Sequence, residues 1–216
     1  MTDTERRRSD KRRDLLDGAL EVFAADGYAR ASIDAIARAA GVSSRTIYNQ
    51  FGDKAGLFEA VIVDSARRVA DAQVALADRL LGGVPGRTRD VEAALVAFGR
   101  VWATADPEFA THFALVRQVR AEIGHVPPDA LRAWQEEGPR RVRRSVAEHL
   151  RRMAEAGLLD LDDADLAANH LILLVANEAI DRAQDRADPP GRAEIHRLAD
   201  AGVRTFLHGR APASKR

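Results

Sequence analysis

Apolar residues recur every three to four positions along most of the 216-residue chain. That spacing places them on one face of an α-helix, and Gly, Pro and capping residues punctuate the runs. The pattern predicts an all-α protein of about nine helices and no strands. The expected helices run from about Ser9 or Asp10 to Ala25, Ile33 to Ala40, Ser43 to Phe51, Asp53 to Leu81, Thr88 to Ala105, Pro107 to Ile123, Pro127 to Ala156, Asp162 or Asp163 through the LILLVA run at 171–176, and beyond Gly191 to His208.

Two short helices meet at a glycine between Ser32 and Phe51. Ser32 precedes the first apolar run and can cap it, and Gly41 suits the left-handed residue that ends a helix. Ser43 is positioned to cap the second helix, whose inner face is formed by Ile47 and Phe51. Helix, short turn and helix is the helix-turn-helix arrangement, in which the second helix lies in the DNA major groove.

The outward positions of the second helix carry side chains suited to DNA. Arg45 can donate two hydrogen bonds to guanine, and Asn49 can pair with adenine. Ser43, Thr46 and Tyr48 carry hydroxyl groups that can contact phosphates, although Ser43 is equally explained as a cap and Tyr48 as a packing residue. Lys54 falls in the first turn of the next helix, where the helix dipole disfavours a cation, so we interpret it as a partner for an external phosphate.

The stretch from Leu15 to Val61 resembles the DNA-binding region of the tetracycline-repressor (TetR) family of bacterial regulators. The matching segments are ALEVFAADGY, IDAIARAAGVS, TIYNQF and the DK that precedes LFEAV. The resemblance implies phosphate contacts by Ser32, Ser43, Thr46, Tyr48 and Lys54, and base or backbone contacts by Ser44, Arg45 and Asn49. The chain departs from the family at Gln50, where an aromatic residue or His is common, and at Ser44-Arg45, where Lys-Gly is common. The DNA-binding set therefore comprises Ser32, Ser43, Ser44, Arg45, Thr46, Tyr48, Asn49, Gln50 and Lys54.

Composition excludes several other classes of protein. The chain has no cysteine, so disulfides, thiolate metal sites and cysteine nucleophiles are impossible. No segment has 18 consecutive apolar residues, so we expect a cytoplasmic, nucleoid-associated protein. The net charge is zero, but arginines and lysines crowd positions 6–13, where an arm could follow the phosphates or remain a solvated tail. The pair Glu122 and His125 is a lone E-x-x-H, so we expect no metal, no cofactor and no enzymatic activity.

Residues 9–69 are predicted to form the DNA-binding domain, and residues 70–210 a helical body for ligand binding and dimerisation. Clustered aromatic residues in the body suggest either dense packing or the wall of a pocket for a small apolar effector. The pocket hypothesis names Phe98, Trp102, Phe109, His112, Phe113, Trp134 and Asn177, with His112 and Asn177 as its polar groups.

The function that these patterns favour is that of a homodimeric repressor, dimerised through its last two helices, bound to a palindromic operator and released by a ligand. Two alternatives stay open. One is a helix-turn-helix regulator controlled by a partner protein, and the other is a helical carrier or enzyme with a vestigial head.

Overall fold

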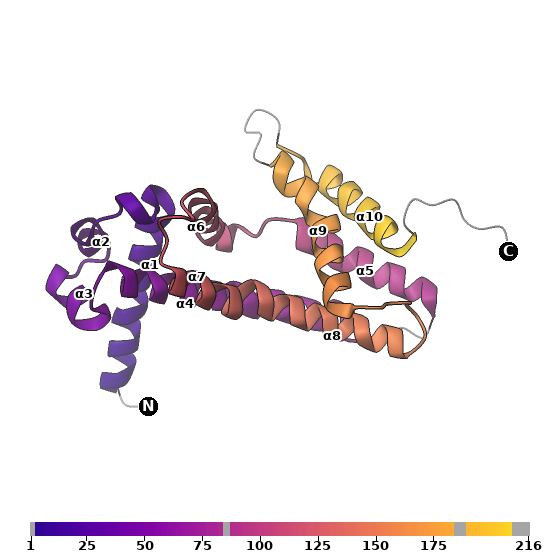
Figure 1. The fold of residues 1–216 in the computed structure, drawn as a ribbon, viewed down its shortest axis with the longest axis horizontal. Helices are drawn as coiled ribbons and strands as arrows, with labels where there is room; N and C mark the ends of the chain where they lie inside the picture. Colours follow the sequence, from indigo (N-terminus) through magenta and orange to yellow (C-terminus); the bar gives the residue numbers. More distant parts are fainter. Residues whose placement is uncertain (1–2, 84–86, 184–188, 209–216) are drawn as a thin grey trace. The chain divides into compact units, whose positions relative to one another are not determined.

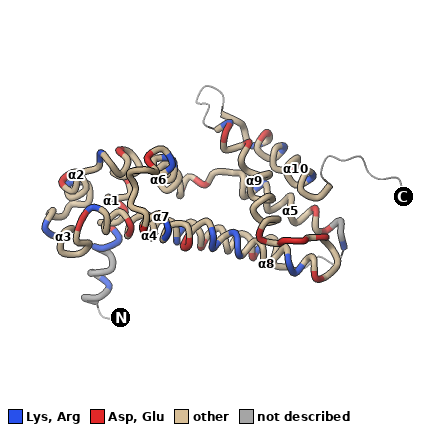
Figure 2. Tube along the Cα trace, in the orientation of Figure 1, with Lys and Arg blue, Asp and Glu red and all other residues tan. Residues whose placement is uncertain are grey.

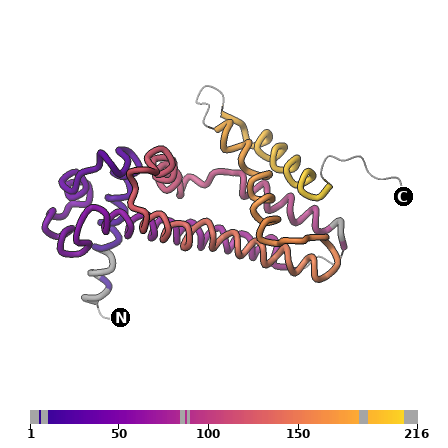
Figure 3. The backbone as a smooth tube through the Cα atoms, in the orientation of Figure 1, coloured from indigo at the N-terminus to yellow at the C-terminus, as the bar shows by residue number. Residues whose placement is uncertain are grey.

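The computed structural model describes residues 3–83, 87–183 and 189–208 (Figures 1 and 3). Every regular element within these ranges is helical, and none is a β-strand. If the continuous run α7–η2–α8 is counted as one helix, the described residues form nine α-helices, which confirms the prediction. The elements are α1 (Asp3–Arg30), α2 (Ile33–Ala39), α3 (Ser44–Phe51), α4 (Lys54–Leu81), α5 (Thr88–Ala103), η1 (Pro107–Phe109), α6 (Ala110–Ala121), α7 (Pro128–Gln135), η2 (Glu136–Arg140), α8 (Arg141–Glu155), α9 (Ala164–Arg182) and α10 (Arg192–His208).

Most helix ends fall where the sequence marks them. The side chain of Asp163 accepts the Leu166 N–H, and the Asp53 carboxylate accepts the Gly56 N–H. Helix α1 is the exception, because it begins six residues before the expected Ser9. Its first residues are mostly charged and carry no apolar stripe, yet arginine, lysine and glutamate are good helix formers. An apolar pattern marks where a helix packs, and α1 continues beyond that point.

The chain divides into two compact units, which are described separately below. The first comprises residues 1–70 and 106–141, and the second comprises residues 71–105 and 142–216. Helices α6 and α7 thus belong to the same unit as the helix-turn-helix, although the sequence-based division assigned them to the body.

In the first unit, α6 packs against α1 beside the turn that leads to α2. Helix α1 is kinked at Gly27, whose φ of 78° is a conformation that favours glycine. The Glu122 carboxylate fills the space that a side chain would need there, since a Cβ on Gly27 would lie 2.5 Å from Glu122 Oε1. Glu122 also accepts the Ala29 N–H at 3.1 Å. One member of the E-x-x-H pair therefore holds α6 to the end of α1.

In the second unit, α5, α9 and α10 cross closely where two glycines remove side-chain bulk. A Cβ on Gly202 would lie 2.1 Å from the Leu174 carbonyl oxygen, and one on Gly99 would lie 3.1 Å from Val175 Cγ1. On the surface, the Arg100 guanidinium donates two hydrogen bonds to Asp200, which joins α5 to α10. The hydrogen bond to Arg100 lowers the pKa of the Asp200 carboxyl below its ordinary value.

Candidate nucleic-acid interface and effector region

The α2–turn–α3 segment has the geometry of a helix-turn-helix (Figure 1). Ser32 and Ser43 cap the two helices, each accepting a backbone N–H at 3.1 Å. Gly41 occupies the turn with a φ of 65°, and the Val42 N–H bonds the Ala37 carbonyl at 3.0 Å. This turn is closed by local hydrogen bonds, so it holds α2 and α3 at a fixed angle.

Burial gives α3 an inner and an outer face. Ile47, on the inner face of α3, is fully buried in the core of the first unit, together with Ile36 and Phe58. Four of the predicted DNA-binding residues lie exposed on the outer face of α3: Arg45, Tyr48, Asn49 and Gln50. Tyr48 leaves 51% of its area exposed, which is unusual for a large aromatic residue that only packs. The outer face therefore presents a guanidinium, a phenol and two amides to solvent.

The other five predicted DNA-binding residues have partners within the protein. Ser32 and Ser43 are the helix caps just described, and the Thr46 hydroxyl lies 2.9 Å from the Ser43 hydroxyl. The Ser44 hydroxyl donates to the Asp34 carboxylate at 2.7 Å, which ties α3 to α2. These side chains hold the helix-turn-helix together. Any of them that contacts DNA would keep this structural role as well.

Lys54 is the clearest such case. Its ammonium donates to the carbonyls of Tyr28, Ala29 and Ala31 at 3.0–3.3 Å, and it lies 4.7 Å from the centre of the Tyr28 ring. These carbonyls lie at and just beyond the C-terminal end of α1, where a cation is favoured by the helix dipole. The lysine in the first turn of α4 thus has partners within the protein, and its contact with a DNA phosphate stays a prediction.

The basic N-terminal segment forms part of helix α1. Arg12 places its guanidinium 4.9 Å from the centre of the Phe51 ring, a cation–π contact that joins α1 to the last residue of α3. Lys11 and Arg13, on either side of Arg12 in the sequence, are exposed, as is Arg6 further towards the N-terminus. Figure 2 shows Lys and Arg positions in blue in the described part of α1 near α3; the side chains of Arg7 and Arg8 lie outside the described residues. Exposed basic residues of α1 thus flank Arg12, which contacts the last residue of α3.

The seven residues of the pocket hypothesis fall in both units. In the first, His112 and Trp134 are buried, Phe109 is partly buried, and Phe113 is 38% exposed beside His112. In the second, Phe98 is fully buried against a partly buried Trp102, with ring centres 5.2 Å apart. Asn177 is exposed on the outer face of α9. Dense packing accounts for Phe98 and Trp102, whereas the His112 region contains buried polar atoms.

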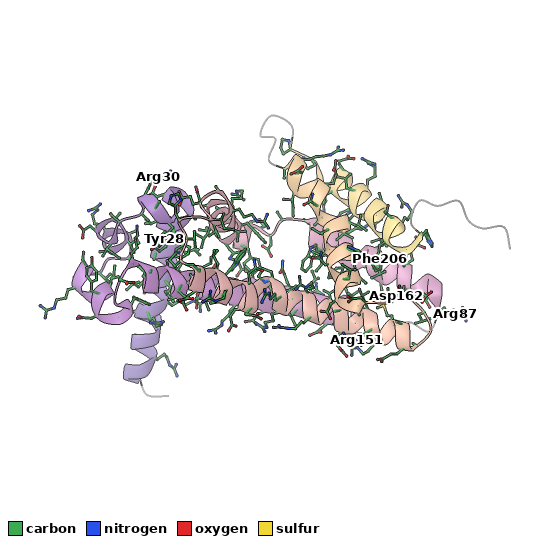
Figure 4. The ribbon with its side chains drawn as sticks, in the orientation of Figure 1. Tyr28, Arg30, Arg87, Arg151, Asp162 and Phe206 are labelled. Atoms are coloured by element: carbon green, nitrogen blue, oxygen red, sulfur yellow. The ribbon has the colours of Figure 1, made fainter. Side chains whose placement is uncertain are left out.

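A surface groove of about 330 Å³ in the second unit lies between α9, α10 and the acidic loop before α9. Asp162 and Phe206 mark its two sides in Figure 4. It contains none of the seven pocket residues. Its lining consists of Asp160, Leu161, Asp162, Asp163, Leu166, Ala167, His170, Leu174, Thr205 and Phe206.

The described part of the chain shows no arrangement that suggests other chemistry. Within it, no group of three or more histidine or acidic side chains is placed to hold a metal ion. No described helix is long and apolar enough to cross a membrane.

Comparison with known proteins places these features in a family. Residues 15–61 match the family described as bacterial regulatory proteins, tetR family, and residues 94–209 match the AefR-like transcriptional repressor C-terminal domain. The second match alone covers more than half of the chain. The protein is thus a helix-turn-helix transcriptional regulator, a class that acts by binding DNA and not by catalysis. It belongs to the TetR family, with an AefR-like C-terminal domain.

Relatives of nearly full length support the assignment. The HTH-type transcriptional repressor Rv1474c of Mycobacterium tuberculosis is 29% identical over 194 residues, covering 90% of this chain and 93% of the relative. A crystal structure described as a TetR-family transcriptional regulator from Mesorhizobium loti is 28% identical with a TM-score of 0.78, and the match covers 96% of this chain and 98% of that one. The flavonoid-responsive regulator FrrA is 28% identical with a TM-score of 0.68, over 94% of this chain and 100% of that one.

Proposed function

We propose that the protein is a homodimeric repressor that binds a palindromic operator and leaves it when a small molecule binds. The observation that carries the DNA-binding part is the outer face of α3, where Arg45, Asn49 and Gln50 are exposed above a buried Ile47. Arginine and amide side chains on a recognition helix are the groups that read base edges in the major groove. A protein that acts in this way works on chromosomal DNA, so the proposed location is the bacterial cytoplasm.

Dimerisation is proposed from a second apolar stripe on α9. The inner stripe of this helix packs within the second unit and includes Leu171 and Val175. On the opposite side, Leu166, Leu173, Leu174 and Ile180 are between 39% and 55% exposed. A run of exposed large apolar residues on one helix face is typical of a protein–protein interface. The natural occupant is the same face of a second copy, with α9 and α10 of both chains forming a four-helix seam.

Dimerisation would also provide sequence specificity that a single recognition helix lacks. One short recognition helix reads few base pairs, whereas two such helices about 34 Å apart read two half-sites one helical turn apart. The two-fold symmetry of the dimer then predicts a palindromic operator.

The ligand part of the proposal is supported by proteins that are similar to this chain. FrrA is described as flavonoid-responsive. Two more distant structures, which show only the shared fold at 20% and 14% identity, are described as complexes with choline and with stearoyl-CoA. We propose an effector that prefers a state in which α4 is tilted, so that the heads no longer match the half-site spacing. An effector that binds the tilted state 100-fold more tightly than the other state stabilises the tilted state by about 2.7 kcal/mol per site.

The test begins with selection of operator DNA by the full-length protein from random duplexes, followed by light scattering of the free protein. We expect an enriched palindrome and a mass twice the 23.6 kDa of one chain. If the dimer neutralises about 6–10 phosphates, operator affinity should fall roughly 10³–10⁵-fold between about 50 and 200 mM salt. A monomer, or binding without any preferred sequence, would contradict the proposal.

A screen of apolar metabolites for operator release then tests the ligand part. A protein that stays on its operator throughout such a screen supports control by a partner protein instead.

A further inference from the structure

The last residue of α3 is contacted by a side chain from outside the helix-turn-helix. The guanidinium carbon of Arg12, on α1, lies 4.9 Å from the centre of the Phe51 ring. This distance is within the range of about 6 Å over which a cation is attracted to the face of an aromatic ring. Arg12 is exposed, and within the described part of the chain it pairs with no carboxylate. The Phe51 ring is therefore the partner that decides where the charge of Arg12 lies.

The two ends of α3 are held in different ways. At the N-terminal end, the Ser44 hydroxyl donates to Asp34 of α2 at 2.7 Å. At the C-terminal end, Gly52 stops the helix with a φ of 80°. Among the described residues, no side-chain hydrogen bond joins the last turn of α3, residues 48–51, to another helix. Phe51 packs partly buried against the core of the first unit and thus links that turn to the rest of the head.

Two electrostatic effects favour a cation beside Phe51. The face of an aromatic ring carries negative charge density, and arginine is found over it more often than lysine. The C-terminal end of a helix is the negative end of the helix dipole, so a cation next to the last residue of α3 is stabilised there as well. Both effects attract Arg12 to the last turn of α3, and the contact in turn restrains that turn.

The restrained turn carries the amide side chains of the outer face. Asn49 and Gln50 directly precede Phe51 and are exposed. A hydrogen bond from an amide to a base edge needs a donor–acceptor distance of about 2.7–3.2 Å, so a small displacement of the turn would lose it. Arg45 lies in the first turn of α3, at the end held by the hydrogen bond to α2. The two ends of the recognition helix are thus positioned by different contacts.

We propose, on the basis of the DNA-binding function above, that Arg12 is a positioning residue for base recognition. Its guanidinium holds the last turn of α3 through the Phe51 ring, and the held turn places Asn49 and Gln50 against their base pairs. In this role Arg12 does not itself contact DNA, which distinguishes it from a basic residue that binds a phosphate. Its effect is confined to the bases that the last turn reads and does not extend to the base read by Arg45.

The experiment uses the full-length protein and the operator that it selects from random duplexes. Titration of single-base operator variants with Asn49→Ala, Gln50→Ala and Arg45→Ala identifies the base pair that each side chain reads. Arg12→Met keeps the apolar stem and removes the charge. We expect this change to lower discrimination about 2–5-fold at the base pairs assigned to Asn49 or Gln50, as the loss of an exposed cation–π contact would, and to leave the Arg45 base pair unchanged.

Three further variants separate positioning from a general effect on the protein. Arg12→Lys should keep the discrimination, because an ammonium can occupy the same face of the ring. In a Phe51→Leu background, Arg12→Met should have no further effect, since the ring is already absent. Arg13→Met, at the exposed neighbouring position, should discriminate as wild type does. Circular dichroism of each variant confirms that the helices remain.

Two outcomes would overturn the proposal. One is a uniform weakening of Arg12→Met on every sequence with a salt slope reduced by about one, which would make Arg12 a phosphate contact. The other is unchanged discrimination at every base pair. If the wild-type protein still prefers its selected operator in these cases, only this inference has failed. A wild-type protein without any preferred sequence would contradict the proposed function, on which the inference rests.

Discussion

The ammonium of Lys54 shows how one residue can hold the DNA-binding head together. It donates to three backbone carbonyls at the end of α1 and lies against the ring of Tyr28. Hydrogen bonds from a charged donor are stronger than neutral ones. Any change at Lys54 is therefore expected to act on the fold before it acts on DNA.

Lys54→Met should lower the free energy of unfolding by about 2 kcal/mol, because Met keeps the apolar stem and loses the charged hydrogen bonds. Urea denaturation at a fixed protein concentration measures the loss, and Lys54→Arg is the control that keeps the charge. Unchanged stability together with a salt slope of operator binding reduced by about one would instead assign the ammonium to a phosphate.

Arg45 is one of the exposed residues on the outer face of α3, so its substitution should affect DNA binding and not stability. Arg45→Ala is expected to leave the unfolding free energy within about 0.5 kcal/mol of wild type, as surface changes usually do. It should cost about 1–3 kcal/mol at one base pair of each half-site and relax the preference there. Titration of single-base operator variants measures this, with Arg38→Ala on the exposed side of α2 as the matched control. Equal weakening on every sequence would make Arg45 a phosphate contact.

His112 predicts a dependence of stability on pH. Its pKa lies near 4 in the fold and near 6.5 when unfolded, so between these values the unfolded chain binds the additional proton. Stability should therefore fall as the pH drops from about 6.5 to about 4, by about 3 kcal/mol from this group. Urea denaturation of wild type and His112→Asn across that range isolates the effect. Asn keeps a polar atom near the position of Nδ1 and does not titrate. Parallel curves would contradict the prediction.

At the scale of elements, the close crossing of α9 and α10 depends on Gly202. A Cβ at this position would lie 2.1 Å from the Leu174 carbonyl oxygen, and a backbone atom cannot move aside as a flexible side chain can. Gly202→Ala should push the two helices apart and cost about 1–3 kcal/mol. Thermal unfolding followed by circular dichroism measures the loss. Gly191→Ala, where a Cβ meets nothing within 4 Å, is the control. An equally small effect of both changes would show that α10 can shift at little cost.

At the scale of the whole molecule, the outer stripe of α9 decides between monomer and dimer. Leu174→Arg should yield a folded monomer, since the side chain is partly exposed within one chain and only a seam would bury the new charge. Light scattering gives the mass, and circular dichroism confirms that the helices remain. Leu171→Arg, on the buried face of the same helix, should unfold the second unit and serves as the contrast. A Leu174→Arg protein that remains a dimer would place the seam elsewhere.

The sequence by itself determined the class of fold and the helix-turn-helix. Those features depend on residues a few positions apart: Ile36 and Ile47 on inner faces, serine caps at 32 and 43, and Gly41 between the helices. Local spacing fixes which side of a short helix is apolar, and a cap acts on N–H groups two or three residues away. The exposed Arg45 and Asn49 follow from the same periodicity.

Only the tertiary structure decided what Lys54, Glu122 and His112 do. Each depends on residues distant in sequence: the carbonyls that end α1 for Lys54, the Gly27 kink for Glu122, and the Ser65 hydroxyl on α4 for His112. No periodicity encodes which helix lies opposite a given side chain. The sequence could name His112 as a member of a pocket, but the Ser65 hydroxyl comes within 2.8 Å of its Nδ1 atom only when α4 and α6 come together.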